Sequence, residues 1–168
     1  MGYDVHRLHP GHPVVLGGVS IPYAAGFVAY ADGDPLSPAV VDAILGAISP
    51  GEDMADRFPD TDPRNEKSRS LDYLYRIPPL LHSLQATIHN VDMVVEAEQP
   101  KLKPHFPVMR HHIAEALAVA LDQGGIKGKT SEGAGYLGRG EAIAVRVVVL
   151  VDRAHLKGKG KNEFQCRG

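Results

Sequence analysis

The stretch Ala142-Ile-Ala-Val-Arg-Val-Val-Val-Leu-Val151 decides the fold of this chain. It is rich in β-branched residues and is long enough for a central strand of a sheet. Weaker signals of the same kind predict further strands at residues 3–7, 14–16, 91–97 and 126–129. The chain is therefore expected to build its core on one sheet whose central strand lies near the C-terminus.

Three segments between these strands have the apolar period of a helix. Ser37-Pro38 predicts an N-cap followed by proline at the first helical position, with an apolar stripe over residues 40–45. A second helix is expected from about Ser68 until Pro78-Pro79 ends or kinks it, and a third over residues 108–121. This mixture predicts an α/β (α+β) fold, a two-layer sandwich in which a mixed four- to five-stranded sheet packs against helices.

The composition limits the classes of function. A length of 168 residues suits one domain, expected over residues 1–153, and residues 154–168 have the Lys-Gly alternation of a mobile tail. The formal net charge of −2 argues against a nucleic-acid binder, and no window is apolar enough to span a membrane. The start of the chain has no secretory signal, and the single cysteine, Cys166, indicates a reducing intracellular compartment.

Two acidic motifs carry the chemistry. Asp4 and His6 are two residues apart, so on a strand their side chains share one face and can begin a zinc or other divalent-metal site. Asp32-Gly33-Asp34 forms an acidic turn that runs into the first helix, which Asp34 can cap. On the residues alone, the first motif is more often an exposed pair on a strand and the second an ordinary turn.

Seven short motifs in order resemble one enzyme family. They are Gly2-Tyr-Asp-Val-His6, Gly17-Gly-Val-Ser-Ile-Pro22, Asp32-Gly-Asp34, Phe58-Pro-Asp-Thr-Asp-Pro63, Asn90-Val-Asp92, Gln99-Pro-Lys101 and Gly138-Arg-Gly-Glu141. None of them is specific alone, but together they are similar to the 2-C-methyl-D-erythritol 2,4-cyclodiphosphate synthases of the non-mevalonate isoprenoid pathway. The resemblance extends from Gly2 to Asp152.

The resemblance implies a phosphorus–oxygen lyase. Such enzymes convert a CDP-linked methylerythritol 2-phosphate to the cyclic diphosphate: the 2-phosphate attacks the β-phosphorus, and CMP leaves. It implies a homotrimer with active sites between subunits and sheets that face the three-fold axis, and a small-molecule substrate rather than nucleic acid or membrane. It also implies Zn²⁺ together with Mg²⁺ or Mn²⁺, and a location in the bacterial cytoplasm or the plastid stroma.

The resemblance also assigns roles to individual residues. Asp4 and His6 match zinc ligands, Glu132 matches the carboxylate of the second metal, and Thr130 matches the hydroxyl that polarises the departing α-phosphate. Asp53 matches the ribose-binding carboxylate, and the loop Asp60-Thr61-Asp62 matches the one that closes over the erythritol. The cytosine cradle corresponds to Ala97, Pro100, Lys101, Leu102 and Lys103. Tyr136 and Arg139 match residues near the trimer axis that can hold a prenyl diphosphate. The other substrate contacts implied are Val5, Met54, Ala55, Phe58, Lys129 and Ser131.

One segment departs from the family pattern. Tyr30 stands where an imidazole helps to stabilise charge at the β-phosphate, and Ala31 stands where a hydroxyl contacts a phosphate oxygen. Pro38 stands at the position of the third zinc ligand and has no side-chain atom that binds a metal. Three readings follow: an active synthase, a silent homologue that binds a cytidine nucleotide or prenyl diphosphate without turnover, and a trimer with no ligand. Tyr30, His9 and His12 are candidates for a substitute ligand.

Overall fold

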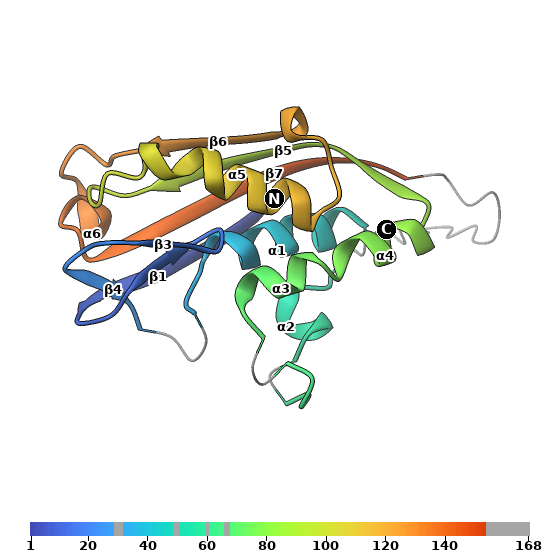
Figure 1. Ribbon diagram of the computed structural model, residues 1–168, viewed down its shortest axis with the longest axis horizontal. Coiled ribbons are helices and arrows are strands. Elements are labelled where there is room, and N and C mark those ends of the chain that lie inside the picture. The colour runs from blue at the N-terminus through green and yellow to red at the C-terminus, as the bar shows by residue number, and fades with distance from the viewer. Residues whose placement is uncertain (29–31, 49–50, 60, 66–67, 154–168) are drawn as a thin grey trace, which may run out of the picture.

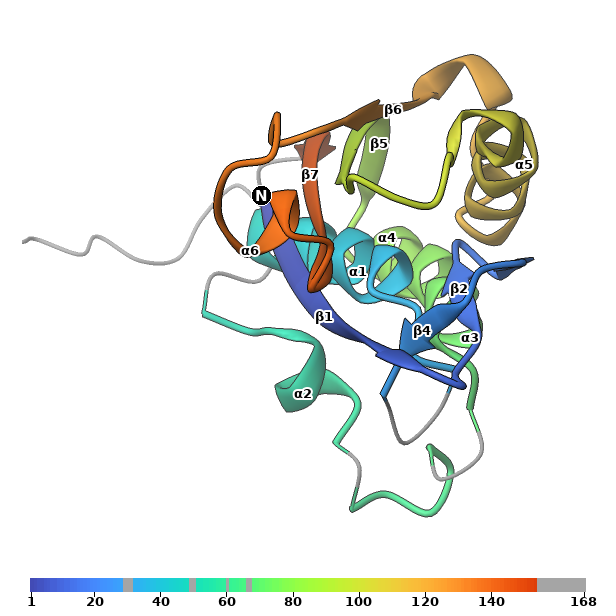
Figure 2. The ribbon, with the colours of Figure 1, turned by 90° about the vertical axis from the view of Figure 1, so that its left-hand side faces the viewer.

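The computed structural model describes residues 1–28, 32–48, 51–59, 61–65 and 68–153. Its strands form a curved five-stranded sheet, and helices α1 (Leu36–Ile48), α3 (Ser70–Leu74), α4 (Ile77–Ser83) and α5 (Phe106–Ala116) cover one face of it (Figures 1 and 2). The predicted two-layer α/β sandwich with a mixed sheet is confirmed. The predicted tail at 154–168 lies outside the described residues.

The sheet has the strand order β4-β1-β7-β5-β6. The strands are β1 (Gly2–Pro10), β4 (Ala25–Phe27), β5 (Ala86–Glu96), β6 (Gly124–Lys129) and β7 (Ala142–Arg153), and β7 is the predicted central strand. It pairs antiparallel with β1 and β5, whereas β5 and β6 run parallel. A separate ribbon of β2 (Val14–Leu16) and β3 (Val19–Ile21) packs beside β4. The two short strands β3 and β4 were not predicted from the sequence.

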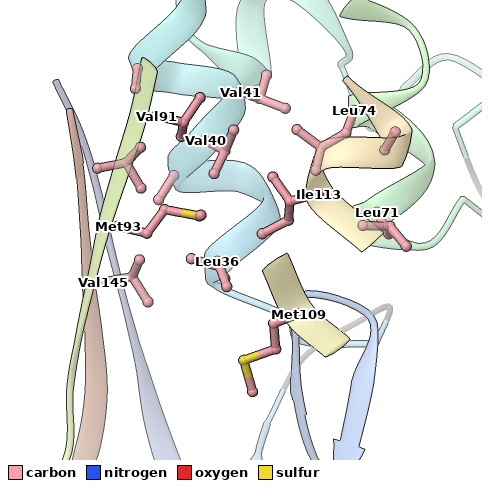
Figure 3. Close-up of a cluster of buried hydrophobic side chains, with 14 of the residues drawn as sticks. Leu36, Val40, Val41, Leu71, Leu74, Val91, Met93, Met109, Ile113 and Val145 are labelled. Carbon is pink, nitrogen blue, oxygen red and sulfur yellow. The ribbon is translucent and has the colours of Figure 1, made fainter. Parts of the chain in front are cut away.

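The core lies between the sheet and helix α1. Along β7 the residues Ile143, Val145 and Val147 are fully buried, because alternate side chains of a strand point to the same face. They pack against α1, whose residues Val40 and Val41 are also fully buried; Val41 lies on the side of α1 away from the sheet, near Leu74 of α3 (Figure 3). Burial of this continuous apolar surface holds the two layers together.

The first helix begins earlier than Ser37-Pro38 predicted. Helix α1 starts at Leu36, and the cap is Asp34, whose carboxylate accepts hydrogen bonds from the backbone N–H groups of Leu36 (2.9 Å) and Ser37 (3.4 Å). A side-chain oxygen that accepts from the first turn is the usual way to cap a helix. Pro38 therefore lies inside the first turn, where its missing N–H removes no helical hydrogen bond.

The other helices also differ in detail from the prediction. Helix α3 ends at Leu74, and Pro78-Pro79 then stand in the first turn of a new helix, α4, where proline is tolerated. Helix α5 stops at Ala116, short of the predicted Leu121, which belongs to a separate 3₁₀ turn, η2 (Leu121–Gln123). Three further short helices were not predicted: α2 (Met54–Arg57), η1 (Lys103–His105) and α6 (Gly135–Gly138).

The face of the sheet opposite α1 carries exposed apolar side chains. Tyr3 and Val5 of β1 are 42% and 38% exposed, and Val148 and Leu150 of β7 are 56% and 62% exposed. They alternate with less exposed residues of the same strands, so they form one surface. Within the described ranges, no helix has the length and apolar character needed to cross a membrane.

Candidate active site

Asp4 and His6 form a pair on β1, as the sequence predicted. His6 Nε2 lies 3.3 Å from Asp4 Oδ2, and both side chains are about a quarter exposed. The other ring nitrogen, Nδ1, lies 2.7 Å from the backbone oxygen of Gly33. Because a carbonyl oxygen only accepts, Nδ1 carries a hydrogen, and the Nε2 of a neutral ring presents a lone pair toward Asp4. Protonation of Nε2 would turn this contact into a hydrogen bond that Nε2 donates to Asp4, and this raises the pKa of His6, although burial of the ring opposes the shift.

The turn that orients His6 is held on both sides of Gly33. Asp32 accepts from the Ser70 hydroxyl at 2.6 Å and from the Ser70 N–H at 3.2 Å, which ties the turn to α3. Asp34 is fully buried and fastens the other side to the start of α1. Gly33 itself has φ +69°, a conformation that glycine adopts without steric cost. The Gly33 carbonyl is thereby fixed where the imidazole of His6 reaches it.

A third metal ligand is missing from the described part of this site. Pro38 stands in the first turn of α1, and no group of three or more His, Cys, Asp or Glu side chains comes together within the described ranges. His9 and His12 contact each other instead, with ring centroids 5.7 Å apart, and His9 Nδ1 lies 3.1 Å from the Pro10 carbonyl. The predicted residues Tyr30 and Ala31 lie outside the described residues.

Asp42 is a titratable group near this site that sequence reasoning missed. It lies four residues after Pro38 on α1, and its carboxylate accepts from the Met54 N–H at 2.7 Å. Burial raises the pKa of Asp42, and the negative charges of Asp53 and Asp4 raise it further. A carboxylate within an apolar helical stretch was the sequence signal for it. Asp42 thus links the start of α2 to the helix that carries Pro38.

A cavity of about 1020 Å³ lies where β5 and β6 end. Its lining includes most of the residues that the resemblance assigned to the nucleotide, namely Ala97, Pro100, Lys101, Leu102, Lys103, Lys129 and Thr130. The parallel pairing of β5 with β6 brings these two sequence-distant segments together, since Glu96 is opposite Lys129. The wall is mainly apolar and carries lysines, a combination that suits a nucleobase and its phosphates.

Beyond this cavity the chain turns through Thr130, Ser131 and Glu132. The Thr130 hydroxyl donates to Glu132 Oε1 at 2.7 Å, so the two residues assigned to the departing phosphate and the second metal are in contact. Glu98, on the cavity wall, accepts from the Ser131 N–H at 2.8 Å and from the Gly133 N–H at 3.3 Å. Glu98 was not among the residues predicted from the sequence.

The residues assigned to the ribose and the erythritol lie on the opposite side of the molecule. Asp53 caps α2 by accepting from the Asp56 N–H at 2.9 Å, and Met54, Ala55 and Phe58 belong to α2 or follow it. Helix α2 and the loop after it lie at the far side of the molecule from β6 (Figures 1 and 2). One chain therefore does not bring Asp53 to the cavity.

The loop after α2 is ordered around Asp62. Arg64 donates to both oxygens of this carboxylate and lowers the pKa of Asp62 from 3.8 to about 2. Thr61 precedes it in the described part of the loop, and Asp60 lies outside the described residues. The charge of Asp62 is therefore partly neutralised before any substrate binds.

Two predicted residues lie in α6 (Gly135–Gly138) or directly after it, beside β1. Tyr136 follows the start of α6, and its hydroxyl lies 3.2 Å from that of Tyr3. Arg139 pairs with Glu141 at 2.6 Å, an exposed contact of the kind that adds little stability. Tyr136 is 43% exposed, so its ring belongs to the same outer surface as Tyr3.

Comparison with known proteins agrees with these features. The model of the YgbB family matches residues 1–152. The 2-C-methyl-D-erythritol 2,4-cyclodiphosphate synthase of Clostridium perfringens is 42% identical over 151 residues, which cover 90% of this chain and 96% of that protein. A solved 2C-methyl-D-erythritol-2,4-cyclodiphosphate synthase with CDP bound matches with a TM-score of 0.81 and 35% identity, covering 90% of this chain and 97% of that one.

A further solved structure, the bifunctional IspDF of Campylobacter jejuni, matches with a TM-score of 0.83 and 33% identity. The match covers 91% of this chain and 41% of that longer protein. Sequence and fold agree along almost the whole length of the described domain. The chain belongs to the YgbB family, which includes the 2-C-methyl-D-erythritol 2,4-cyclodiphosphate synthases that it resembles in both sequence and fold.

Proposed function

We propose that the chain is a 2-C-methyl-D-erythritol 2,4-cyclodiphosphate synthase, a lyase of the non-mevalonate route to isoprenoids. The observation that carries this proposal is the cavity at the ends of β5 and β6, built from the family's own motifs in a chain 42% identical to a synthase of that name. A binding protein without turnover is the less favoured reading, because the relatives of similar identity are named as the enzyme.

The reaction needs no nucleophile from the protein. An oxygen of the substrate's 2-phosphate bonds to the β-phosphorus, and the bond from that phosphorus to the oxygen bridging it to the α-phosphorus breaks. The electron pair leaves with CMP. We therefore infer that the chain contributes position and charge: the cavity wall would hold the cytidine, and Thr130 and Lys129, which line the cavity, would contact the departing α-phosphate. A divalent cation, when bound, neutralises the developing charge on the diphosphate.

The metal-binding side chains of this chain suit Mg²⁺ or Mn²⁺ better than Zn²⁺. Glu132 offers a hard carboxylate oxygen, and Mg²⁺ or Mn²⁺ is commonly bound by one or two carboxylates together with substrate phosphates. Asp4 and His6 offer two donors for Zn²⁺, whose catalytic sites usually have three protein ligands, and the described residues supply no third. We therefore assign Glu132 to the second metal and infer that zinc binds weakly here, with a correspondingly slower reaction.

We also infer a homotrimer in which each site is shared by two subunits. Two features support this inference. Asp53 and the loop after α2 lie far from the cavity within one chain (Figure 2), so a complete substrate site needs a second copy. Tyr3, Val5, Val148 and Leu150 form an exposed apolar surface of the kind that oligomers bury. In this assembly residues 1–153 form the synthase domain, and Tyr136 and Arg139 lie near the axis.

The bacterial relatives support a location in the bacterial cytoplasm, and a plastid stroma is compatible with the same pathway. Residues 154–168 are proposed to be a tail outside the synthase domain, because the family model matches residues 1–152. Deleting them is expected to leave the release of CMP unchanged. A loss of activity would place part of the site in the tail.

The function is tested by following CMP release from the CDP-linked substrate with Zn²⁺ and Mg²⁺ supplied. The native chain is compared with Pro38→His, which adds an imidazole at the vacant position, and with Pro38→Ala, which removes proline without adding a ligand. We expect slow release by the native chain and by Pro38→Ala. Pro38→His should bind more zinc per chain and release CMP faster.

Each possible result has a clear reading. Binding of CDP without CMP release by either the native chain or Pro38→His would overturn the proposed enzyme function. One zinc per native chain, measured by elemental analysis, would contradict the inference that a ligand is missing. Equal gains in Pro38→Ala and Pro38→His would show that the backbone at this position, and not an imidazole, limits the site.

A further inference from the structure

Glu132 has a backbone conformation that its position in the fold does not explain. Three non-glycine residues of the described chain have positive φ angles: Gln85 (50°), Ala118 (54°) and Glu132 (50°). Gln85 and Ala118 come directly after the C-cap residues of α4 and α5, where a left-handed residue commonly ends a helix. Glu132 follows a strand instead, in the turn between β6 and α6. A strained conformation of this kind is a reason to look for a function.

The turn itself is tight and disfavours glutamate. The Ser131 carbonyl accepts from the Ala134 N–H at 2.8 Å, and the two residues between them, Glu132 and Gly133, have φ angles of 50° and 78°. Turns with two such central residues strongly prefer asparagine, aspartate or glycine at the first of them. Contacts outside the turn must therefore help to hold Glu132 in place.

Glu98 makes those contacts. A single oxygen, Oε1, accepts hydrogen bonds from the N–H groups of Ser131 and Gly133, the residues on either side of Glu132. Gly138 supports the turn from another direction, since a Cβ atom there would lie 2.1 Å from the carbonyl carbon of Gly133. With both neighbours held, the side chain of Glu132 is directed to Thr130, whose hydroxyl is 2.7 Å from Glu132 Oε1.

We propose that Glu98 is a positioning residue for the reaction, which holds the Glu132 carboxylate beside Thr130 at the edge of the nucleotide cavity. The proposal rests on the proposed function, because it takes Glu132 as the residue that binds the second divalent cation. Glu98 does not bind that cation. It acts as a hydrogen-bond acceptor for the backbone on both sides of Glu132, and an amide oxygen can fill that role as well as a carboxylate oxygen.

The test compares the full-length chain with Glu98→Ala, which removes the acceptor, and Glu98→Gln, which keeps it. Glu115→Ala is the matched control, because Glu115 is an exposed glutamate of α5 outside the site. Glu132→Ala tests whether Glu132 binds the second divalent cation. The measurements are Mn²⁺ affinity of the CDP complex by electron paramagnetic resonance, CDP affinity without metal by calorimetry, and kcat and KM for CMP release.

We expect Glu98→Ala to weaken Mn²⁺ binding by about 10–100-fold, the usual effect of losing a residue that orients a metal ligand. The value of kcat should fall with it. The KM and the metal-free affinity for CDP should change much less, because Glu98 is one residue of the cavity wall and the proposed cytosine cradle at residues 100–103 is untouched. Glu98→Gln and the Glu115→Ala control should resemble the native chain. If Glu98→Ala fails to fold, Glu98→Met gives the same test, since it keeps the length without a strong acceptor.

The outcomes separate this proposal from the proposed function. Suppose that Glu98→Ala binds Mn²⁺ as tightly as the native chain, while Glu132→Ala binds it more weakly. This result would overturn the role of Glu98 and leave the metal assignment of Glu132 intact. If Glu98→Gln weakens Mn²⁺ binding as much as Glu98→Ala does, the charge of Glu98 and not its role as an acceptor is needed. That result would also overturn the proposed role of Glu98. Native Mn²⁺ affinity in Glu132→Ala would overturn the metal assignment, and the role of Glu98 with it.

Discussion

Asp34→Asn tests how the turn beside His6 is held. Asp34 is fully buried, and its carboxylate accepts four hydrogen bonds. Oδ2 accepts from the Gly18 N–H at 3.1 Å and the Ser37 hydroxyl at 2.7 Å, and Oδ1 accepts from the N–H groups of Leu36 and Ser37. Asparagine has the same shape but replaces one of these oxygens with a hydrogen-bond donor.

The cost follows from which oxygen is replaced. An amide nitrogen in place of Oδ1 leaves two backbone donors, of Leu36 and Ser37, without an acceptor. An amide nitrogen in place of Oδ2 leaves only the Gly18 N–H without an acceptor, because the Ser37 hydroxyl can rotate and accept a hydrogen bond from the amide. The second arrangement destabilises the fold less, so asparagine is expected to adopt it. One buried donor without a partner lowers the free energy of unfolding by about 1–3 kcal/mol. For a chain of this size that loss lowers Tm by about 2–12 °C.

The assay is urea unfolding at pH 7 and at one fixed protein concentration, with Asp122→Asn as the control for an exposed carboxylate. Burial raises the pKa of Asp34, whereas its hydrogen bonds lower it. A neutral Asp34 at pH 7 would donate as asparagine does, and the substitution would then cost almost nothing. A loss of stability below about 0.5 kcal/mol, the usual range for an exposed site, would refute the assignment of four donors to this carboxylate.

Three further predictions concern the site and the assembly. Glu132→Asn should raise stability by about 1 kcal/mol in urea unfolding, because asparagine tolerates the left-handed conformation, while CMP release falls; unchanged release would contradict its role. Because Arg64 lowers the pKa of Asp62 to about 2, the folded state binds fewer protons than the unfolded state between about pH 4 and pH 2. The native chain should therefore lose more stability than Asp62→Asn as pH falls through this window, because other carboxylates titrate in both proteins. Equal losses of stability in the two proteins would show that Asp62 contributes nothing. Val148→Asp with Leu150→Asp should leave a monomer in sedimentation experiments, and a persisting trimer would show that this surface is not the interface.

The sequence predicted those elements whose signal lies within a few neighbouring residues. Strand β7 was predicted because its β-branched run is long, and α1 because its apolar period is regular. Strand β2 was predicted from its apolar run Val-Val-Leu, whereas β3 and β4, which also have three residues each, contain Ser20 and Gly26 and form through pairing with β2 and β1. The sequence offered both Ser37 and Asp34 as the cap of α1, since both residue types cap helices, and only the fold shows that Asp34 reaches the first turn.

The site was predictable to the extent that its residues are neighbours in the sequence. Asp4 and His6 form a pair because a strand places them on one face, and this needed no tertiary contact. Glu98 was missed because its partners, Ser131 and Gly133, are 33 and 35 residues away and contribute backbone groups, which any residue carries. Side-chain identity gives no signal for an interaction of this kind.

The contacts that orient His6 also explain why one added imidazole is expected to complete the zinc site. The Gly33 carbonyl holds the ring, and it is fixed by Asp32 on Ser70 and by Asp34 on the start of α1. These two carboxylates also join α3 and cap α1, so they stabilise the fold whether or not a metal binds. The orientation of His6 therefore does not depend on Pro38. Because proline in the first turn of α1 removes no helical hydrogen bond, histidine can replace it without disturbing that turn, and Pro38→His supplies the third donor to a pair that is already in place.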